Sequence, residues 1–277
     1  MGQVFTWEDV ARGRVPYPED IQEVVHLVRR RLADEPGVKF ATLFGSVVRG
    51  DFDIRSDIDC LMVFENAHEA QVRKVTNALS TFARELYVPI NFTPCDVAMA
   101  QTRFHHLGTA FIRHVSGTMR VGGLIKGESF LEVLAPTVPV DQEIESYLKM
   151  KLYTMMECLA SDSVFSEEQQ VRFFKKGLEA VTHTARKVLL YEDLLVGDSK
   201  QEVRMRYREV MPQNLSDMLD ALIMLDHLYT EELYDQLDDG LNEAKYRAVL
   251  SLLSLGMPSI AEFIRLNILH ISAQTRQ

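Results

Sequence analysis

Two carboxylates separated by one residue are the most chemically suggestive feature of the sequence. Asp57 and Asp59 stand at the start of an apolar run, Cys60–Phe64. Because alternate side chains of a strand leave the same face, a strand here places both carboxylates side by side, while Ile58 points to the core. Paired carboxylates supply the hard oxygen ligands that Mg²⁺ prefers, with substrate phosphates completing its coordination. The spacing therefore predicts a magnesium site at the start of this strand.

A candidate phosphate-binding loop precedes the two aspartates. Gly45 follows a short β-prone run, Val38–Phe44, and lets the backbone turn sharply and approach a ligand closely. Ser46 then opens a short helix, where its hydroxyl and the free N–H groups face an anion such as a triphosphate. Arg49 adds a planar, permanently charged donor for a phosphate oxygen. We therefore expect Gly45, Ser46 and Arg49 to bind the triphosphate of a nucleotide.

Taken together, the Gly-Ser, Arg-Gly and Ser-Asp-x-Asp elements of residues 45–59 resemble the nucleotidyltransferase superfamily that includes DNA polymerase β. The resemblance is to its minimal and aminoglycoside-nucleotidyltransferase branches. It implies an enzyme of the EC 2.7.7 type that transfers a nucleoside monophosphate, in the leading interpretation AMP from ATP, to an acceptor hydroxyl with two Mg²⁺ ions. It also implies catalytic and metal-binding roles for Asp57 and Asp59, and triphosphate contacts for Ser46, Arg49 and Ser56.

One position departs from the family pattern. Members of the family take a third carboxylate from the following strand, expected here at Val88–Thr93, and Asn91 stands at that place. Its side chain should then point at Asp57 and Asp59. An asparagine offers a metal only a neutral oxygen, which makes Asn91 a weak ligand, and it does not act as a general base. Either another group deprotonates the acceptor, or the protein binds NTP with little or no turnover.

Hydrophobic periodicity divides the chain into two parts. Residues 1–128 alternate helical patterns with β-prone runs, which predicts an α/β nucleotidyltransferase domain with a small mixed sheet and flanking helices. A proline-containing stretch, 129–140, predicts a linker, and residues 141–277 predict an all-α bundle of four to six helices. We expect helices at 18–33, 67–87 and 96–115, then from 141, at 166–195, at 214–240 with a break near Thr230, at 241–255, and from 259.

Composition and charge exclude several classes of protein. The 277 residues are 47% hydrophobic and 25% charged, a profile typical of a soluble globular protein. The formal net charge is −10, which argues against non-specific binding to nucleic acid. No apolar run approaches the roughly 18 residues of a membrane helix, and the first residues do not resemble a signal peptide. Three cysteines without a CxxC pair indicate a reducing compartment, so we expect a cytoplasmic protein.

An acidic run bears on the identity of the acceptor. Between Arg208 and Lys245 there are ten carboxylates and no lysine or arginine. A solvated helix face explains such a run. An acidic wall beside the active site would instead attract a cationic acceptor such as an aminoglycoside and could supply the base that Asn91 lacks. The sequence leaves both interpretations open.

Other interpretations also stay open. The partners we expect are NTP and a small-molecule acceptor, with no membrane. A different class of function is a degenerate or antitoxin-like nucleotidyltransferase that binds nucleotide and regulates a protein partner; a third is a protein adenylyltransferase. His105 and His106 are adjacent, so they diverge on a helix and predict structural roles. Arg265 and His270 match an R-x4-H pattern of helical ribonucleases, but so short a pattern arises often by chance.

Overall fold

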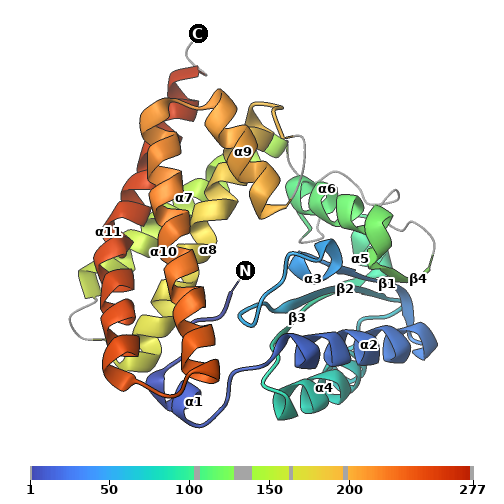
Figure 1. Ribbon diagram of the computed structural model, residues 1–277. Helices are drawn as coiled ribbons and strands as arrows, with labels where there is room; N and C mark the ends of the chain where they lie inside the picture. Colours follow the sequence, from blue (N-terminus) through green and yellow to red (C-terminus); the bar gives the residue numbers. More distant parts are fainter. Residues whose placement is uncertain (1, 103–106, 128–138, 162–164, 196–198, 275–277) are drawn as a thin grey trace. The chain divides into compact units, whose positions relative to one another are not determined.

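The computed structural model describes residues 2–102, 107–127, 139–161, 165–195 and 199–274, which form two units (Figure 1). The first unit comprises Val15–Glu143, and the second comprises Gly2–Arg14 together with Ile144–Gln277. Residues 128–138, most of the predicted linker, lie outside the described residues. Residues 2–14, which the sequence-based division assigns to the N-terminal domain, belong to the second unit.

A mixed four-stranded sheet in the order β3-β2-β1-β4 forms the centre of the first unit. β1 (Val38–Phe44) pairs antiparallel with β2 (Ile58–Phe64) and with β4 (Leu124–Lys126), and β2 pairs parallel with β3 (Ile90–Asp96). The central strands are the most apolar, as expected where a strand is buried on both faces. The small mixed sheet predicted from the sequence is therefore confirmed. Pro94 lies within β3, an edge strand, where the missing N–H is tolerated.

Helices cover both faces of this sheet (Figure 1). On one face, α2 (Pro18–Asp34) and α4 (Glu69–Glu85) bury an apolar stripe against the sheet; on the other lie α5 (Val97–Ala100) and α6 (Thr109–Thr118). α2 confirms the helix predicted at 18–33, with a proline at its first position. The single helix predicted at 96–115 is wrong among the described residues, because α5 ends at Ala100. A π-helical turn, η1 (Met119–Gly123), connects α6 to β4.

Among the described residues of the second unit, all regular elements are helices. The unit contains α1 (Trp7–Ala11), α7 (Val140–Ser161, whose first residues belong to the first unit), α8 (Glu167–Tyr191), α9 (Lys200–Val210), α10 (Gln213–Asp238) and α11 (Glu243–Gln274). The helix predicted at 166–195 is confirmed as α8, and a capping box marks its start. Gln169 donates its N–H to Ser166 Oγ at 3.3 Å, and Ser166 donates its N–H to Gln169 Oε1 at 2.9 Å.

Two predicted helix breaks are wrong. α10 continues through Thr230, whose hydroxyl donates to the carbonyl oxygen of Asp226 at 2.9 Å within the helix. α11 continues through Pro258, where the sequence predicts two separate helices. Met257 and Ile260, on either side of the proline, are fully buried. The packing of both halves of α11 therefore outweighs the backbone hydrogen bond that the proline removes.

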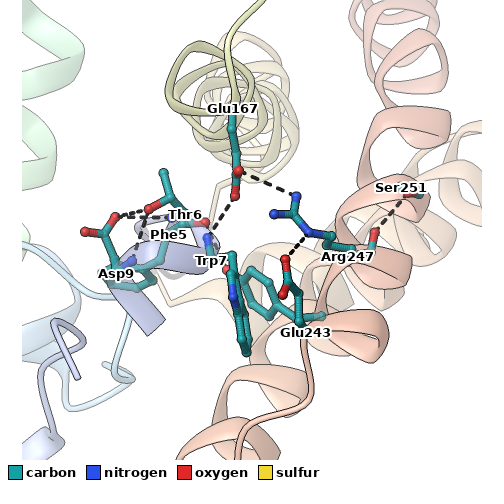
Figure 2. A network of polar contacts seen from close by, with 9 residues as sticks. Phe5, Thr6, Trp7, Asp9, Glu167, Glu243, Arg247 and Ser251 are labelled. Carbon is teal, nitrogen blue, oxygen red and sulfur yellow. Dashed lines mark hydrogen bonds and ion pairs between the residues drawn. The ribbon is translucent and has the colours of Figure 1, made fainter. Parts of the chain in front are cut away.

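The N-terminal segment is held in the second unit by hydrogen bonds to distant residues. The N–H of Phe5 donates to Tyr229 Oη and its carbonyl accepts from Tyr246 Oη, both at 2.9 Å. The N–H of Trp7 donates to Glu167 Oε1 at 2.8 Å, and Arg247 bridges Glu167 and Glu243 beside it (Figure 2). Partners more than 150 residues away explain why local sequence patterns do not reveal this docking.

One helix has the length and apolar character of a membrane span. Among the described residues, an 18-residue stretch within Glu243–Ala273 of α11 has a mean hydropathy of 1.5, and 39% of that stretch is buried. Leu253, Ile260 and Ile264 of this helix are buried in the unit, and Asn267 accepts a hydrogen bond from Tyr207 Oη at 2.7 Å. A core helix of a helical unit has the same properties, so length and hydropathy are weak evidence for a membrane.

Candidate functional site

Three polar side chains meet where β2 and β3 begin. Asp59 and Asn91 are neighbours in the parallel register of these strands, and Asp57 lies two residues before Asp59. Asn91 Nδ2 donates to Asp57 Oδ2 at 2.7 Å and to Asp59 Oδ1 at 3.2 Å. Both carboxylates therefore leave the same face, and Asn91 points at them. The sequence-based expectation that the Asn91 side chain points at Asp57 and Asp59 is therefore confirmed.

The three side chains form a negatively charged site. Asp57 is buried and Asp59 half-buried, so water screens their mutual repulsion only in part. The Asn91 amide donates to one oxygen of each carboxylate but carries no charge. A divalent cation would neutralise the pair more completely.

The oxygen atoms of Asp57, Asp59 and Asn91 are suitable ligands for Mg²⁺, but they fill only part of its coordination. Asp57 and Asp59 offer carboxylate oxygens, and Asn91 offers an amide oxygen if its side-chain amide turns over. No group of three His, Cys, Asp or Glu side chains is placed to hold a metal in the part of the chain that the structure describes. A metal here would therefore need phosphate or water oxygens to complete its coordination.

Gly45 brings the backbone against this acidic pair. It has φ +81° and ψ −156°, a conformation that is essentially restricted to glycine. A Cβ atom at this position would lie 2.8 Å from Asp59 Oδ2. Both the backbone conformation and the space beside Asp59 require glycine, so the sharp turn predicted after β1 is confirmed.

Two side chains next to Gly45 have a buried polar atom without a hydrogen-bond partner among the described residues. Ser46 and Arg49 begin and end the short helix α3 (Ser46–Arg49). Ser46 Oγ is buried and has no hydrogen-bond partner among the described residues; the same is true of Arg49 Nη1. Arg49 Nε donates to the carboxylate of Asp51 at 3.2 Å, which orients the guanidinium. Because buried polar groups are nearly always hydrogen-bonded, these two atoms suit an incoming acceptor such as a phosphate oxygen.

Ser56 shapes the loop that carries Asp57. It is buried, its Oγ accepts the N–H of Asp53 at 3.0 Å, and its own N–H donates to the carbonyl of Asp53 at 2.9 Å. The N–H of Arg55 donates to Asp53 Oδ1 at 2.9 Å. These bonds form a tight turn directly before the aspartates. The contact between Ser56 and a triphosphate stays a prediction.

Sequence reasoning missed Arg55. Its side chain is 1% exposed and heads the largest fully buried side chains of the described residues. It lies two residues before Asp57, in a polar stretch where nothing in the local pattern separates a buried arginine from a solvated one. Only the folded loop reveals that this arginine is buried.

Asp96 does not replace the missing third carboxylate. The sequence places it beyond the strand, but it is the last residue of β3, at the opposite end from Asn91. Its carboxylate accepts the N–H groups of Ala67, Ala98 and Met99 at 2.8, 2.8 and 3.2 Å. These backbone hydrogen bonds lower the pKa of Asp96 below its ordinary value. Asp96 therefore caps α5 and anchors the loop before α4.

The other residues singled out by sequence lie apart from this site or outside the described chain. His105 and His106 are not among the described residues. Arg265 pairs with Glu262 at 2.6 Å, whereas His270 bonds to Glu192 at 2.8 Å. The two residues of the R-x4-H pattern thus have different partners, as expected for structural side chains.

Most carboxylates of the acidic run form ion pairs or hydrogen bonds with other side chains. Asp220 contacts Arg204 at 2.7 Å and Arg208 at 3.3 Å, and Lys245 lies between two further carboxylates. The partnered carboxylates of the run include Glu209, Asp217, Asp220, Glu231, Glu232, Asp235 and Glu243. The run does not present ten free negative charges, which favours its interpretation as a solvated, ion-paired helix face.

Comparison with known proteins supports the assignment of the first unit. Residues 25–99 match the nucleotidyltransferase domain family, and this segment contains all the predicted site residues. A search of curated proteins finds no match. Twelve chains of solved structures match, among them spectinomycin adenyltransferase from Enterococcus faecialis with ATP and spectinomycin. That match is 13% identical, covers 89% of this chain and 98% of the other, and has a TM-score of 0.47, which is too low to support an argument about function.

Proposed function

We propose that this chain, whose residues 25–99 form a nucleotidyltransferase domain, transfers a nucleoside monophosphate to a hydroxyl group of a small molecule, with AMP from ATP as the leading case. The observation that carries the proposal is the convergence of Asp57, Asp59 and Asn91 beside Gly45. Nucleotidyl transfer requires carboxylates that hold a metal ion, next to hydrogen-bond donors that bind the phosphates of the nucleotide.

Residues of the Gly45 loop would bind the triphosphate. The glycine lets the backbone approach the phosphates, because no side chain fills the space beside Asp59. Ser46 would donate its hydroxyl to a phosphate oxygen, and Arg49 would donate through Nη1 while Asp51 holds Nε. Ser46 Oγ and Arg49 Nη1 have no hydrogen-bond partner among the described residues, so neither atom has to break a hydrogen bond to bind a phosphate.

The acidic pair would hold the metal. Asp57 and Asp59 would ligate Mg²⁺, two ions in the family pattern, and the metal when bound neutralises triphosphate charge and makes the acceptor hydroxyl more acidic. Asn91 would have to give up its hydrogen bonds to the carboxylates before it offered its oxygen. Gly45 and the turn at Asp53–Ser56 keep the carboxylates in place while the nucleotide binds.

The proton acceptor is the weakest part of this site. Asn91 does not take up a proton, and Asp96 lies at the far end of β3. This arrangement supports slow turnover, or a base supplied by another residue or by the acceptor itself. It also favours one alternative of a different class: a nucleotide-binding regulator of a protein partner that retains the NTP site without rapid chemistry.

A panel of acceptors tests the proposal. The protein is incubated with each NTP, Mg²⁺ and a set of aminoglycosides and uncharged hydroxyl compounds, while pyrophosphate release and the acceptor mass are measured. We expect pyrophosphate release with a matching mass gain, absent in Asp57→Asn. NTP binding that depends on Mg²⁺ without any transfer would favour the regulatory alternative; no NTP binding would refute both.

The cellular compartment is a further part of the proposal. Cys60, Cys95 and Cys158 form no disulfide, and burial raises the pKa of the Cys60 and Cys95 thiols. Buried, protonated thiols behave as small apolar side chains. These properties support a protein of the cytoplasm.

A further inference from the structure

The Asn91 amide lies between Asp57 and Asp59, in the position that a shared cation would occupy. Its Nδ2 donates to Asp57 Oδ2 at 2.7 Å and to Asp59 Oδ1 at 3.2 Å, so one amide group bridges one oxygen of each carboxylate. An amide oxygen turned to the same place would repel both ionised carboxylates, which decides which end of the amide faces them. The N–H groups of a neutral side chain therefore bind the two oxygens that a bridging metal ion would bind.

A metal ion does not fit into this position beside the amide. Mg²⁺ binds its oxygen ligands at about 2.0–2.1 Å, so an ion between the same two oxygens would lie against the hydrogens on Nδ2. These hydrogens carry partial positive charge and would repel the ion. Asp57 is buried, so water screens this repulsion only in part. Asn91 would have to turn its amide over and lose both hydrogen bonds before an ion entered there.

The second oxygen of Asp59 faces the phosphate-binding loop instead. Asn91 donates to Oδ1, whereas Oδ2 lies on the side of Gly45, where a Cβ atom would come within 2.8 Å of it. The same loop carries Ser46 Oγ and Arg49 Nη1, buried polar atoms without a hydrogen-bond partner among the described residues. A cation ligated by Asp59 on this side would also meet the phosphate oxygens that the loop binds. One metal position is therefore compatible with the Asn91 hydrogen bonds, and it lies on the nucleotide side.

A second ion would also lack a charged ligand. Among the described residues, no third His, Cys, Asp or Glu joins Asp57 and Asp59 in a group that could hold a metal. Two divalent cations carry four positive charges against two carboxylates, and the amide adds no negative charge. We infer, on the basis of the proposed function, that this chain binds one divalent cation with its nucleotide, where the family pattern has two. The Asn91 amide takes the place of the other cation.

The number of bound metal ions tests this inference. The full chain is titrated with Mn²⁺ and non-hydrolysable analogues of ATP, GTP, CTP and UTP, at concentrations that saturate the nucleotide site, and bound Mn²⁺ is counted by electron paramagnetic resonance. We expect one Mn²⁺ per chain in the wild type and two in Asn91→Asp, where a carboxylate replaces the amide. Asn77→Asp, on the exposed surface of α4, is the control and should match the wild type. Two ions in the wild type, or one in Asn91→Asp, would overturn the inference.

Removal of the amide distinguishes a substitute for a cation from a weak metal ligand. Without nucleotide, Asn91→Ala should bind Mn²⁺ about tenfold more tightly than the wild type, because the ion no longer has to displace two hydrogen bonds to charged groups. Mn²⁺ should also raise the melting temperature of Asn91→Ala more than that of the wild type. Asn77→Ala should behave as the wild type. Weaker or unchanged Mn²⁺ binding in Asn91→Ala would show a ligand or a bystander and would overturn the inference; if this variant does not fold, the ion counts above decide.

Transfer activity separates the role of Asn91 from the proposed function. One bound Mn²⁺ without nucleotidyl transfer would count against the proposed function alone. Transfer with two ions bound to the wild type would support the proposed function and overturn the role of Asn91 as a substitute for a cation. Absence of binding of every nucleotide analogue would overturn both.

Discussion

Replacing Gly45 by alanine tests how tightly the loop geometry is tied to the acidic pair. Alanine at φ +81° and ψ −156° costs about 1–3 kcal/mol, because this region is essentially closed to residues with a Cβ atom. The new Cβ would also lie 2.8 Å from Asp59 Oδ2, closer than such contacts occur. Because Oδ2 is at the end of the Asp59 side chain, we expect the alanine Cβ to displace this carboxylate. The displacement would disturb the 3.2 Å hydrogen bond that Asp59 accepts from Asn91.

Gly50 supplies a matched control for this substitution. It has a similar φ of +79°, but a Cβ atom there would meet nothing within 4 Å. Gly50→Ala should therefore cost about 1 kcal/mol of conformational strain and leave the site intact. Gly45→Ala should cost as much or more and, in addition, weaken Mg²⁺-dependent NTP binding about tenfold or more, because Asp59 is displaced.

Denaturant unfolding and NTP titration together decide the outcome. Unfolding of each variant gives the change in stability, and titration of NTP with and without Mg²⁺ gives the change at the site. Our reasoning would be refuted if Gly45→Ala bound NTP with wild-type affinity while losing no more stability than Gly50→Ala. Equal losses of NTP binding in both variants would show that the loop, rather than contact with Asp59, controls the site.

Three other expectations concern the site and its supports. Asp57→Asn or Asp59→Asn should reduce Mg²⁺-dependent pyrophosphate release at least a hundredfold and leave the circular dichroism spectrum unchanged, since a charge is removed without changing side-chain volume; equal turnover would contradict the assignment. Asp96→Ala should destabilise the protein by about 1 kcal/mol at neutral pH through loss of a helix cap. Because the pKa of Asp96 is lowered on folding, its contribution is present above the unfolded pKa and is lost as the pH falls through the folded value, so the stability difference from wild type should shrink in acid; a constant difference would count against this cause. If the acidic run binds a cationic acceptor, calorimetry should show polycation affinity that falls with salt; absence of binding would leave only the solvated-face interpretation.

The parts of the fold that the sequence predicts are those with a strong local cause. α2 follows from its apolar spacing and its proline at the first position, and β2 from its continuous apolar run. The relation of Asp57, Asp59 and Asn91 could also be predicted, because strand periodicity and the order of strands place them on one face. Local periodicity and one motif therefore suffice for the centre of the site.

The parts that sequence reasoning missed depend on distant contacts or weak patterns. α9 is highly charged and buries only Val203 and Tyr207, so its apolar spacing is weak. The break expected near Pro258 is overridden by burial on both sides. The N-terminal segment docks through Tyr229 and Tyr246, which no local pattern connects to it. Arg55 is buried by the folded loop rather than by an apolar sequence.

The most direct measurement is the Mg²⁺ affinity of wild type and Asn91→Asp in the presence of ATP. Asn91 lies within 3.2 Å of both aspartates, so a carboxylate there adds charge at the point where a shared metal would bind. Asn77→Asp, on the exposed surface of α4, adds the same charge to the same unit and is the control. We predict that Asn91→Asp binds Mg²⁺ about tenfold more tightly and releases pyrophosphate faster, whereas Asn77→Asp matches the wild type. Unchanged Mg²⁺ affinity in Asn91→Asp would contradict the assignment of this site as the metal centre of a nucleotidyltransferase.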